Sequence, residues 1–119
     1  MVKSLKPHAQ FRLRITKDAE IALGPGKVAL LEAIVSTGSI TAAAKVLGMS
    51  YRRAWLLIDS MNKMFKFPVV DAATGGKNGG GTVVTSNGMQ VIECYRRIEE
   101  DALKASNHDI KRLSRLLRD

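Results

Sequence analysis

Two helical patterns separated by only three residues constrain the fold of this chain more than any other feature. The first is capped by Ser39, contains the small residues Ala42–Ala44 and ends at Gly48. The second is capped by Ser50 and covers residues 51 to about 67, where a proline follows. Serine favours helix starts and glycine favours helix ends. The sequence therefore predicts two helices that pack closely across a short turn, as in a helix-turn-helix.

The residues before this motif predict a small β element and one more helix. Apolar and polar side chains alternate over Gln10–Asp18, which is typical of a half-buried strand, and Ile21–Leu23 is a candidate second strand. A helix is expected over Lys27–Ser36, because apolar residues recur there at helical spacing: Val28, Leu31, Ile34 and Val35.

The residues after the motif predict a hairpin and a long C-terminal helix. Val69–Ala73 and Val83–Val84 are strand signals, and Gly75–Gly81 between them holds five glycines in seven positions. Thr85 or Ser86 then caps a helix whose apolar side carries Met89, Ile92, Tyr95, Ile98, Ala102 and Leu103. We expect a break and a new cap at Ser106–Asp109, followed by a second apolar stripe of Ile110, Leu113, Leu116 and Leu117.

Together these elements predict a mainly α fold with small β elements. The expected architecture is a winged helix-turn-helix with a β-hairpin wing and a long C-terminal dimerisation helix over about 86–119. No repeat or linker divides the chain, so we expect a single domain over residues 1–119.

The charge of the chain favours a polyanionic partner. Its 19 Lys and Arg residues exceed its 11 Asp and Glu residues, which gives a formal net charge of +8. Twelve of the basic residues and only five acids lie before Ser86, so the excess belongs to the first two-thirds of the chain. Nucleic acid and anionic membrane are the two candidate partners. The absence of a long apolar run argues against a membrane span. The single cysteine, Cys94, excludes an internal disulfide and a thiolate zinc cluster, so we expect a cytoplasmic setting.

The second helix of the motif has two distinct sides. Helical spacing places Ala54, Leu57, Ile58, Met61 and Phe65 toward the core and leaves Ser50, Tyr51, Arg52, Trp55 and Asp59 outside. Arg52 suits paired hydrogen bonds to guanine, while Ser50, Tyr51 and the helix N-terminus suit phosphate. Trp55 suits a thymine methyl group or a sugar edge, and Arg53 lies at the border of the two sides. The alternative is that Tyr51 and Trp55 are core residues on a wide apolar face.

The glycine-rich hairpin is the expected wing. Its glycines permit close approach to a phosphate or a groove, Lys77 supplies a charge and Asn78 an amide. It is not a P-loop, because Lys77 is followed by Asn78. The alternative is a hairpin tip without a function. With Ser39 and Thr41 at the start of the preceding helix, the candidate DNA contacts are Ser39, Thr41, Ser50, Tyr51, Arg52, Arg53, Trp55, Lys77 and Asn78.

These stretches resemble the DNA-binding domain of ModE-type molybdate-responsive regulators, a relative of the LysR-type winged helix. The matching residues are TGSITAAAKVLGMSYRRAW (37–55), Asn62, ATGGKNGGGTVVT (73–85) and Gly88, and the resemblance covers roughly residues 15–105. It implies a dimeric regulator whose long final helix pairs with that of its partner. It also implies that Ser50, Tyr51, Arg52 and Trp55 lie at the major groove and Lys77 in the wing. Full-length members carry a molybdate-binding region after this part, and we expect no molybdate site within these 119 residues.

The final helix predicts a homodimer on physical grounds as well. Ile92, Tyr95, Ile98 and Ala102 need burial, and one small domain does not readily cover them all. A twofold dimer sets two recognition helices about 34–36 Å apart, which predicts a near-palindromic operator in double-stranded DNA. The alternative is that this stripe packs only on its own domain.

Four other functions are alternatives to sequence-specific DNA binding. A sequence-independent architectural DNA binder shares the basic charge. A protein-interaction module can keep the fold without the DNA, but Arg52 and Arg53 argue against it. The final helix is too evenly charged for binding to a membrane surface. We expect no enzyme, catalytic residue, metal or cofactor, because His8 and His108 lie near the chain ends and Cys94 is expected to be a packing residue.

Overall fold

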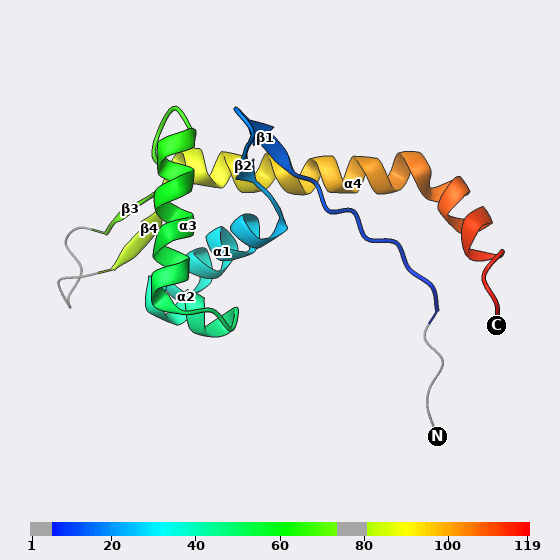
Figure 1. Cartoon of the computed structure of the whole chain (residues 1–119), viewed down its shortest axis with the longest axis horizontal. Coiled ribbons are helices and arrows are strands. Elements are labelled where there is room, and N and C mark those ends of the chain that lie inside the picture. Colours follow the sequence, from blue (N-terminus) through cyan, green and yellow to red (C-terminus); the bar gives the residue numbers. More distant parts are fainter. Residues whose placement is uncertain (1–5, 74–80) are drawn as a thin grey trace, which may run out of the picture.

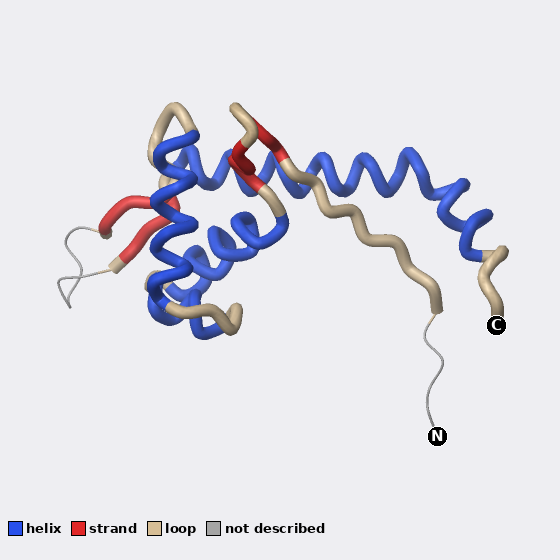
Figure 2. The backbone as a smooth tube through the Cα atoms, in the orientation of Figure 1, coloured by secondary structure: helices blue, strands red, loops and turns tan. Residues whose placement is uncertain are grey.

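The computed structural model describes residues 6–73 and 81–119 and confirms the winged helix-turn-helix architecture. Four helices and two small antiparallel hairpins alternate along this part of the chain (Figures 1 and 2). In chain order they are β1 (Ile15–Lys17), β2 (Glu20–Leu23), α1 (Pro25–Thr37), α2 (Ile40–Val46), α3 (Tyr51–Met64), β3 (Val70–Ala72), β4 (Thr82–Val84) and α4 (Ser86–Ser114).

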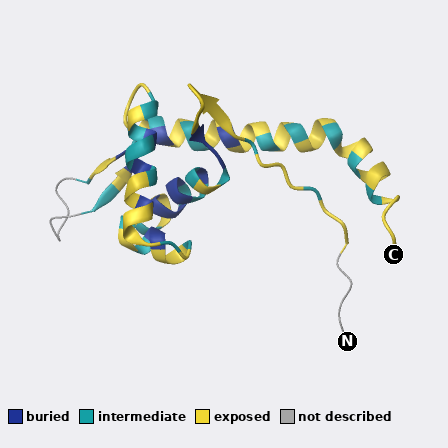
Figure 3. Cartoon of the chain, viewed as in Figure 1, coloured by how far each residue is buried: buried dark blue, intermediate teal, exposed yellow. Residues whose placement is uncertain are grey.

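Helix α1 lies at the centre of the core and contacts α2, α3, α4 and β4. Pro25 at its first position suits the helix start, and Gly38 with a φ of 71° ends it. Its fully buried residues are Val28, Leu30 and Leu31, with Ile34 almost as buried. In Figure 3 much of this helix has the dark colour of buried residues. Val35, which the spacing placed on the apolar face, is half exposed. Leu30, which the spacing did not place on the apolar face, is fully buried, because neighbouring elements cover α1 on more than one side.

The first strand is shorter than the sequence predicted. Only Ile15–Lys17 pairs with β2, and the register shifts between Ile15 and Thr16. Residues 10–14 belong to no strand, although their alternation is that of one. The reason is the partner: β2 ends at Leu23 and α1 begins two residues later, so no strand continues beside residues 10–14.

Helices α2 and α3 form the expected pair, with the small residues Ala43, Ala44 and Ala54 buried between them and α1. Ile58 and Met61 are buried as predicted, and Leu57 and Phe65 are partly buried against the same core. The helix ends at Met64, three residues earlier than expected.

Asn62 explains this early end of α3. Its side-chain oxygen accepts hydrogen bonds from the backbone N–H groups of Val69 (2.8 Å) and Val70 (3.3 Å). Its amide nitrogen donates to the carbonyl oxygen of Val70 (3.0 Å). These bonds hold the start of β3 beside the last turn of α3, so the chain leaves the helix before Pro68.

Helix α4 is continuous, and the predicted break at Ser106–Asp109 was wrong. Thr85 caps its start by accepting a hydrogen bond from the N–H of Gly88 (3.0 Å). The hydroxyl of Ser106 donates to the carbonyl oxygen of Ala102 (2.6 Å), one turn earlier. Ser106 therefore satisfies its side chain within the helix and caps nothing. Figure 1 shows that the second half of α4 extends beyond the other helices and the hairpins, and that the segment before β1 runs toward the same end of the molecule. No helix in the described part of the chain is long and apolar enough to cross a membrane.

Candidate nucleic-acid interface

The turn between α2 and α3 fixes how α3 is presented. Gly48 has a φ of 67°, a left-handed conformation that favours glycine. The N–H of Gly48 donates to the carbonyl oxygen of Lys45 (3.2 Å), and that of Met49 to the carbonyl oxygen of Ala44 (3.0 Å). The chain thus reverses within three residues, and α3 begins at the surface next to the end of α2.

The first three residues of α3 are exposed, and the first turn carries no acidic side chain. The hydroxyl oxygen of Ser50 accepts a hydrogen bond from the N–H of Arg53 (3.1 Å), which caps the helix. The first N–H groups of a helix have no partner within it and carry a partial positive charge. The Ser50 hydroxyl keeps its own proton for a further bond. This end of α3 is therefore suited to a negatively charged group.

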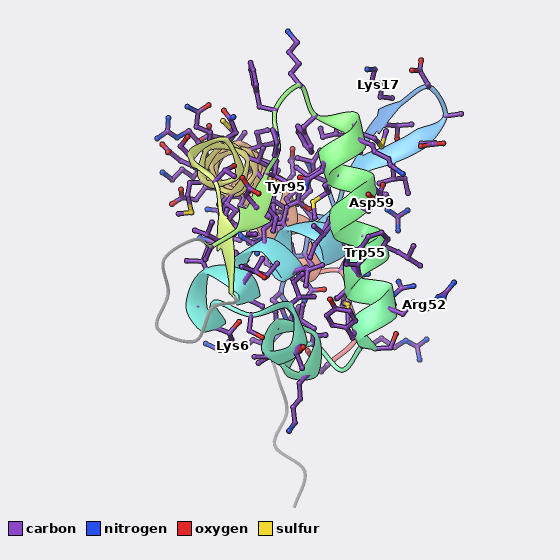
Figure 4. The ribbon with its side chains drawn as sticks, turned by 90° about the vertical axis from the view of Figure 1, so that its left-hand side faces the viewer. Lys6, Lys17, Arg52, Trp55, Asp59 and Tyr95 are labelled. Carbon is purple, nitrogen blue, oxygen red and sulfur yellow. The ribbon has the colours of Figure 1, made fainter. Side chains whose placement is uncertain are left out.

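The side chains expected on the outer side of α3 do lie there. Tyr51 is 53% exposed and Trp55 is 47% exposed, and both arginines that follow Tyr51 are exposed as well. Figure 4 shows Arg52 and Trp55 on the outward side of the helix. The alternative that Tyr51 and Trp55 are core residues is thereby excluded. Leu56, which the sequence analysis did not single out, is also half exposed on this helix.

Charges are free at the start of α3 and paired toward its end. Asp59 forms an ion pair with Lys63 (2.8 Å), and the hydrogen bond from this carboxylate raises the pKa of Lys63. Within residues 6–73 and 81–119, neither Arg52 nor Arg53 takes part in an ion pair. The unpaired positive charge of α3 is thus concentrated next to its N-terminus.

Ser39 and Thr41 lie at the start of α2. The Ser39 hydroxyl oxygen accepts a hydrogen bond from the N–H of Ala42 (3.1 Å), and Thr41 is exposed. The hydroxyl of the neighbouring Thr37 donates to the carbonyl oxygen of Ala33 (2.7 Å), which secures the end of α1. Ser39 is therefore held in place as a cap, and Thr41 is accessible from solvent.

The base of the predicted wing is present beside the helix pair. Strands β3 and β4 are antiparallel, with Val70 opposite Val84 and Ala72 opposite Thr82. The N–H of Thr82 donates to the carbonyl oxygen of Gly38 (3.0 Å), which anchors β4 to the turn between α1 and α2. Lys77 and Asn78 lie outside the described residues.

Lys27 is a supporting residue that sequence reasoning missed. Its amine donates to the carbonyl oxygen of Ile21 and to the hydroxyl of Ser60 (3.1 Å), which joins β2 and α1 to α3. Partial burial lowers the pKa of Lys27, and the charge of Glu20 opposes this shift. A lysine near the start of a helix gives no sequence signal for such a role, because Ser60 is far away in the chain.

Helix α4 is fastened to the domain by its first half. The Arg96 guanidinium pairs with the carboxylate of Glu32 on α1 and with that of Glu99 (2.7 Å), and these hydrogen bonds raise its pKa. The Tyr95 hydroxyl donates to the carbonyl oxygen of Leu13 (2.9 Å). Farther along, α4 exposes large apolar side chains to solvent: Ile98, Leu103 and Leu113 are between 40% and 65% exposed.

Comparison with known proteins identifies the family. The family model of the bacterial regulatory helix-turn-helix proteins, lysR family, matches residues 26–89, which is more than half of the chain. The chain belongs to this family. Its match runs from α1 to the start of α4 and so contains the helix pair and both strands of the wing base. The family is one of regulatory proteins and not of enzymes, as the sequence analysis expected.

Several known bacterial proteins are similar over most of the chain. The molybdenum-pterin-binding protein MopB of Rhodobacter capsulatus is 49% identical over 82 residues, 69% of this chain and 30% of MopB. The molybdenum transport protein ModE of Azotobacter vinelandii is 39% identical over 103 residues, 87% of this chain and 38% of that protein. The DNA-binding transcriptional dual regulator ModE of Escherichia coli is 36% identical over 97 residues, 82% of this chain and 37% of that protein. The chain thus spans between 30% and 38% of the length of these relatives, and their names agree with the resemblance seen in the sequence.

Proposed function

We propose that this chain is a sequence-specific, DNA-binding transcription regulator that reads the major groove with the N-terminal half of α3. The observation that carries the proposal is the exposed, unpaired cluster of Tyr51, Arg52, Arg53 and Trp55 at a capped helix start. The net charge of +8 and the membership of a regulatory helix-turn-helix family support it.

Each candidate residue has a distinct role in this proposal. Arg52 makes paired hydrogen bonds to a guanine, which is the commonest specific contact in the major groove. Ser50 and Tyr51 contact phosphate next to the helix N-terminus, and Arg53 adds a salt-dependent phosphate contact. Trp55, one turn later, packs against a thymine methyl group or a sugar edge.

A second set of contacts comes from outside α3. Ser39 and Thr41 approach the backbone at the start of α2, where the Ser39 hydroxyl retains a proton to donate. Lys77 and Asn78 extend the contact through the wing, whose base is anchored to Gly38. Because these contacts address the sugar-phosphate backbone, they fix the register of α3 in the groove more than they choose a sequence.

The protein binds DNA as a homodimer in this proposal, with α4 as the interface. The exposed apolar residues Leu103 and Leu113 on the second half of α4 support a dimer, because monomeric proteins seldom expose a row of large apolar side chains to water. A twofold axis between two α4 helices makes the operator nearly palindromic.

A DNA partner in a bacterial regulatory family implies that the protein acts in the cytoplasm. The names of the relatives refer to molybdenum, but no molybdenum or molybdate binding is proposed for this chain.

Selection of bound sequences from a random DNA pool tests the proposal. We expect the wild-type protein to enrich one nearly palindromic site and the Arg52→Ala variant to lose it. The matched control is Arg97→Ala, which removes the same charge from an exposed position on α4 and should keep the site. If the protein were an architectural DNA binder, the wild type and both variants would each retain all sequences of the pool equally. That result would overturn the proposal.

A further inference from the structure

A cavity of about 550 Å³ lies outside the surface proposed to contact DNA, and three elements form its walls. One wall is the N-terminal hairpin, the second is the end of α3 with the loop that follows, and the third is the first half of α4. Its volume falls in the range of small-molecule sites in proteins. Its apolar lining includes Leu13, Phe65, Phe67, Val69, Val91 and Ile98.

The charged side chains that line this cavity are all positive. Of its fifteen lining residues two are lysines, Lys17 and Lys66, and none is acidic. Both lysines are exposed at the rim, and in the portion of the chain that the structure describes neither takes part in an ion pair. Gln90 and Asn87 add amide groups on the α4 side. We propose that the cavity binds a small amphipathic carboxylate, whose hydrocarbon or aromatic body fills the groove and whose charge meets Lys17 and Lys66.

A second copy of the chain is a poorer occupant than such a ligand. Successive residues of a helix are separated by about 100°, so Asn87, Gln90 and Cys94 lie on one flank of the row that runs from Tyr95 to Leu113. Tyr95 and Ile98 line the cavity as well, but Tyr95 is already buried by its own chain, and the stripe proposed for the dimer lies farther along α4, at Leu103 and Leu113. A second copy also carries a net charge of +8, which offers Lys17 and Lys66 no excess of negative charge.

Occupation of the cavity has a structural consequence. Its walls join the end of α3 to α4, the recognition helix to the helix of the proposed dimer. A bound ligand therefore favours the arrangement of these two helices that closes best around it. An effect of the ligand on DNA affinity depends on the proposed function of the protein. Binding of the ligand to the cavity does not depend on it.

The single cysteine provides a direct readout. Cys94 is exposed and lines the cavity, so a ligand in the cavity slows its alkylation by a neutral reagent such as iodoacetamide. The probe is sodium decanoate, and the control is decyltrimethylammonium, which has the same chain length and the opposite charge. We expect saturable protection by decanoate and none by the cation, with calorimetry as an independent measure of binding.

Substitutions at the rim separate this site from unspecific binding of fatty chains. Lys17→Ala and Lys66→Ala should each weaken decanoate binding by about 3-fold, as expected for the loss of an exposed charge pair. Lys104→Ala, a lysine of α4 outside the cavity, should leave it unchanged. Equal protection by both probes, or none by decanoate, overturns the proposal. Protection that rises with protein concentration without ligand, and is lost in Leu113→Asp, also overturns it, because a second copy then fills the groove.

Discussion

Gly88 at the start of α4 packs directly against the carbonyl oxygen of Val69, with no space for a side chain between them. A Cβ atom at Gly88 would overlap with that oxygen and would lie 2.5 Å from a methyl carbon of Val84. Val69 directly precedes β3 and Val84 ends β4, so both contacts are between the start of α4 and the base of the wing. Gly88→Ala should therefore lower the free energy of unfolding by about 1–3 kcal/mol, the usual range for overpacking, measured by urea titration.

Gly26 supplies the matched control for this prediction. It lies in the first turn of α1, and a Cβ atom there meets nothing within 4 Å. Gly26→Ala should leave stability unchanged or raise it by up to about 1 kcal/mol, because alanine loses less backbone entropy in a helix. Equal effects of the two substitutions would show that the close packing of Gly88 is not what matters.

Tyr95 predicts how stability depends on alkaline pH. Burial raises the pKa of its phenol above the ordinary value of 10, with the charge of Glu99 acting in the same direction. The unfolded chain loses this proton first, so the stabilisation is complete below pH 10 and is lost as the pH rises through the higher pKa of the folded state. Tyr95→Phe should cost about 1 kcal/mol near pH 7, where the bond to Leu13 is lost, and less above pH 10.

The exposed tyrosine of α3 is the control for Tyr95. Tyr51→Phe removes a hydroxyl from a side chain that is half exposed to solvent. The free energy of unfolding of this variant should therefore match that of the wild type at both pH 7 and pH 11. A Tyr95→Phe deficit that stays constant between pH 7 and pH 11 would contradict the assignment of the alkaline loss to this phenol.

Arg53 is expected to contact phosphate and not a base. Arg53→Gln should weaken binding to specific and unrelated DNA by similar factors, and should reduce the slope of log affinity against log salt by about 1. The measurement is a salt series by fluorescence anisotropy, with Arg97→Gln on α4 as a control of equal charge. If Arg53→Gln weakened only the specific site, this arginine would have to be a base-reading residue.

Leu113 tests the proposed dimer. It is 65% exposed on the second half of α4, so a charge there disturbs nothing inside the domain. Leu113→Asp should convert a dimer to a monomer in sedimentation equilibrium and leave the far-ultraviolet circular dichroism unchanged. Lys111→Asp, two residues earlier and on the opposite side of the helix, is the control and should remain dimeric. A wild-type protein that sediments as a monomer at micromolar concentration would contradict the proposal.

Local signals sufficed to predict the helix pair and the wing base. Serine caps at Ser39 and Ser50, glycine at Gly48 and the apolar spacing of α3 depend only on neighbouring residues, and the structure has them as expected. The exposure of Tyr51 and Trp55 followed from the same spacing. The proposed DNA contacts themselves remain predictions.

The errors came from partners that a periodic pattern does not specify. Residues 10–14 alternate like a strand but have no partner strand, and α3 ends early because Asn62 holds β3. Ser106 resembles a cap, yet its hydroxyl bonds within a continuous helix. A periodic pattern indicates what a segment is able to form, whereas its partners decide where the segment stops.

The affinity ratio between the selected site and a scrambled duplex of the same length tests the central claim most directly. At physiological salt the account predicts a ratio of about 1,000 or more for the wild type, as for other specific DNA-binding proteins. Arg52→Ala should reduce that ratio at least about tenfold, while Arg97→Ala preserves it. A wild-type ratio close to one, or an unchanged ratio in Arg52→Ala, would contradict the reading of DNA by the exposed start of α3.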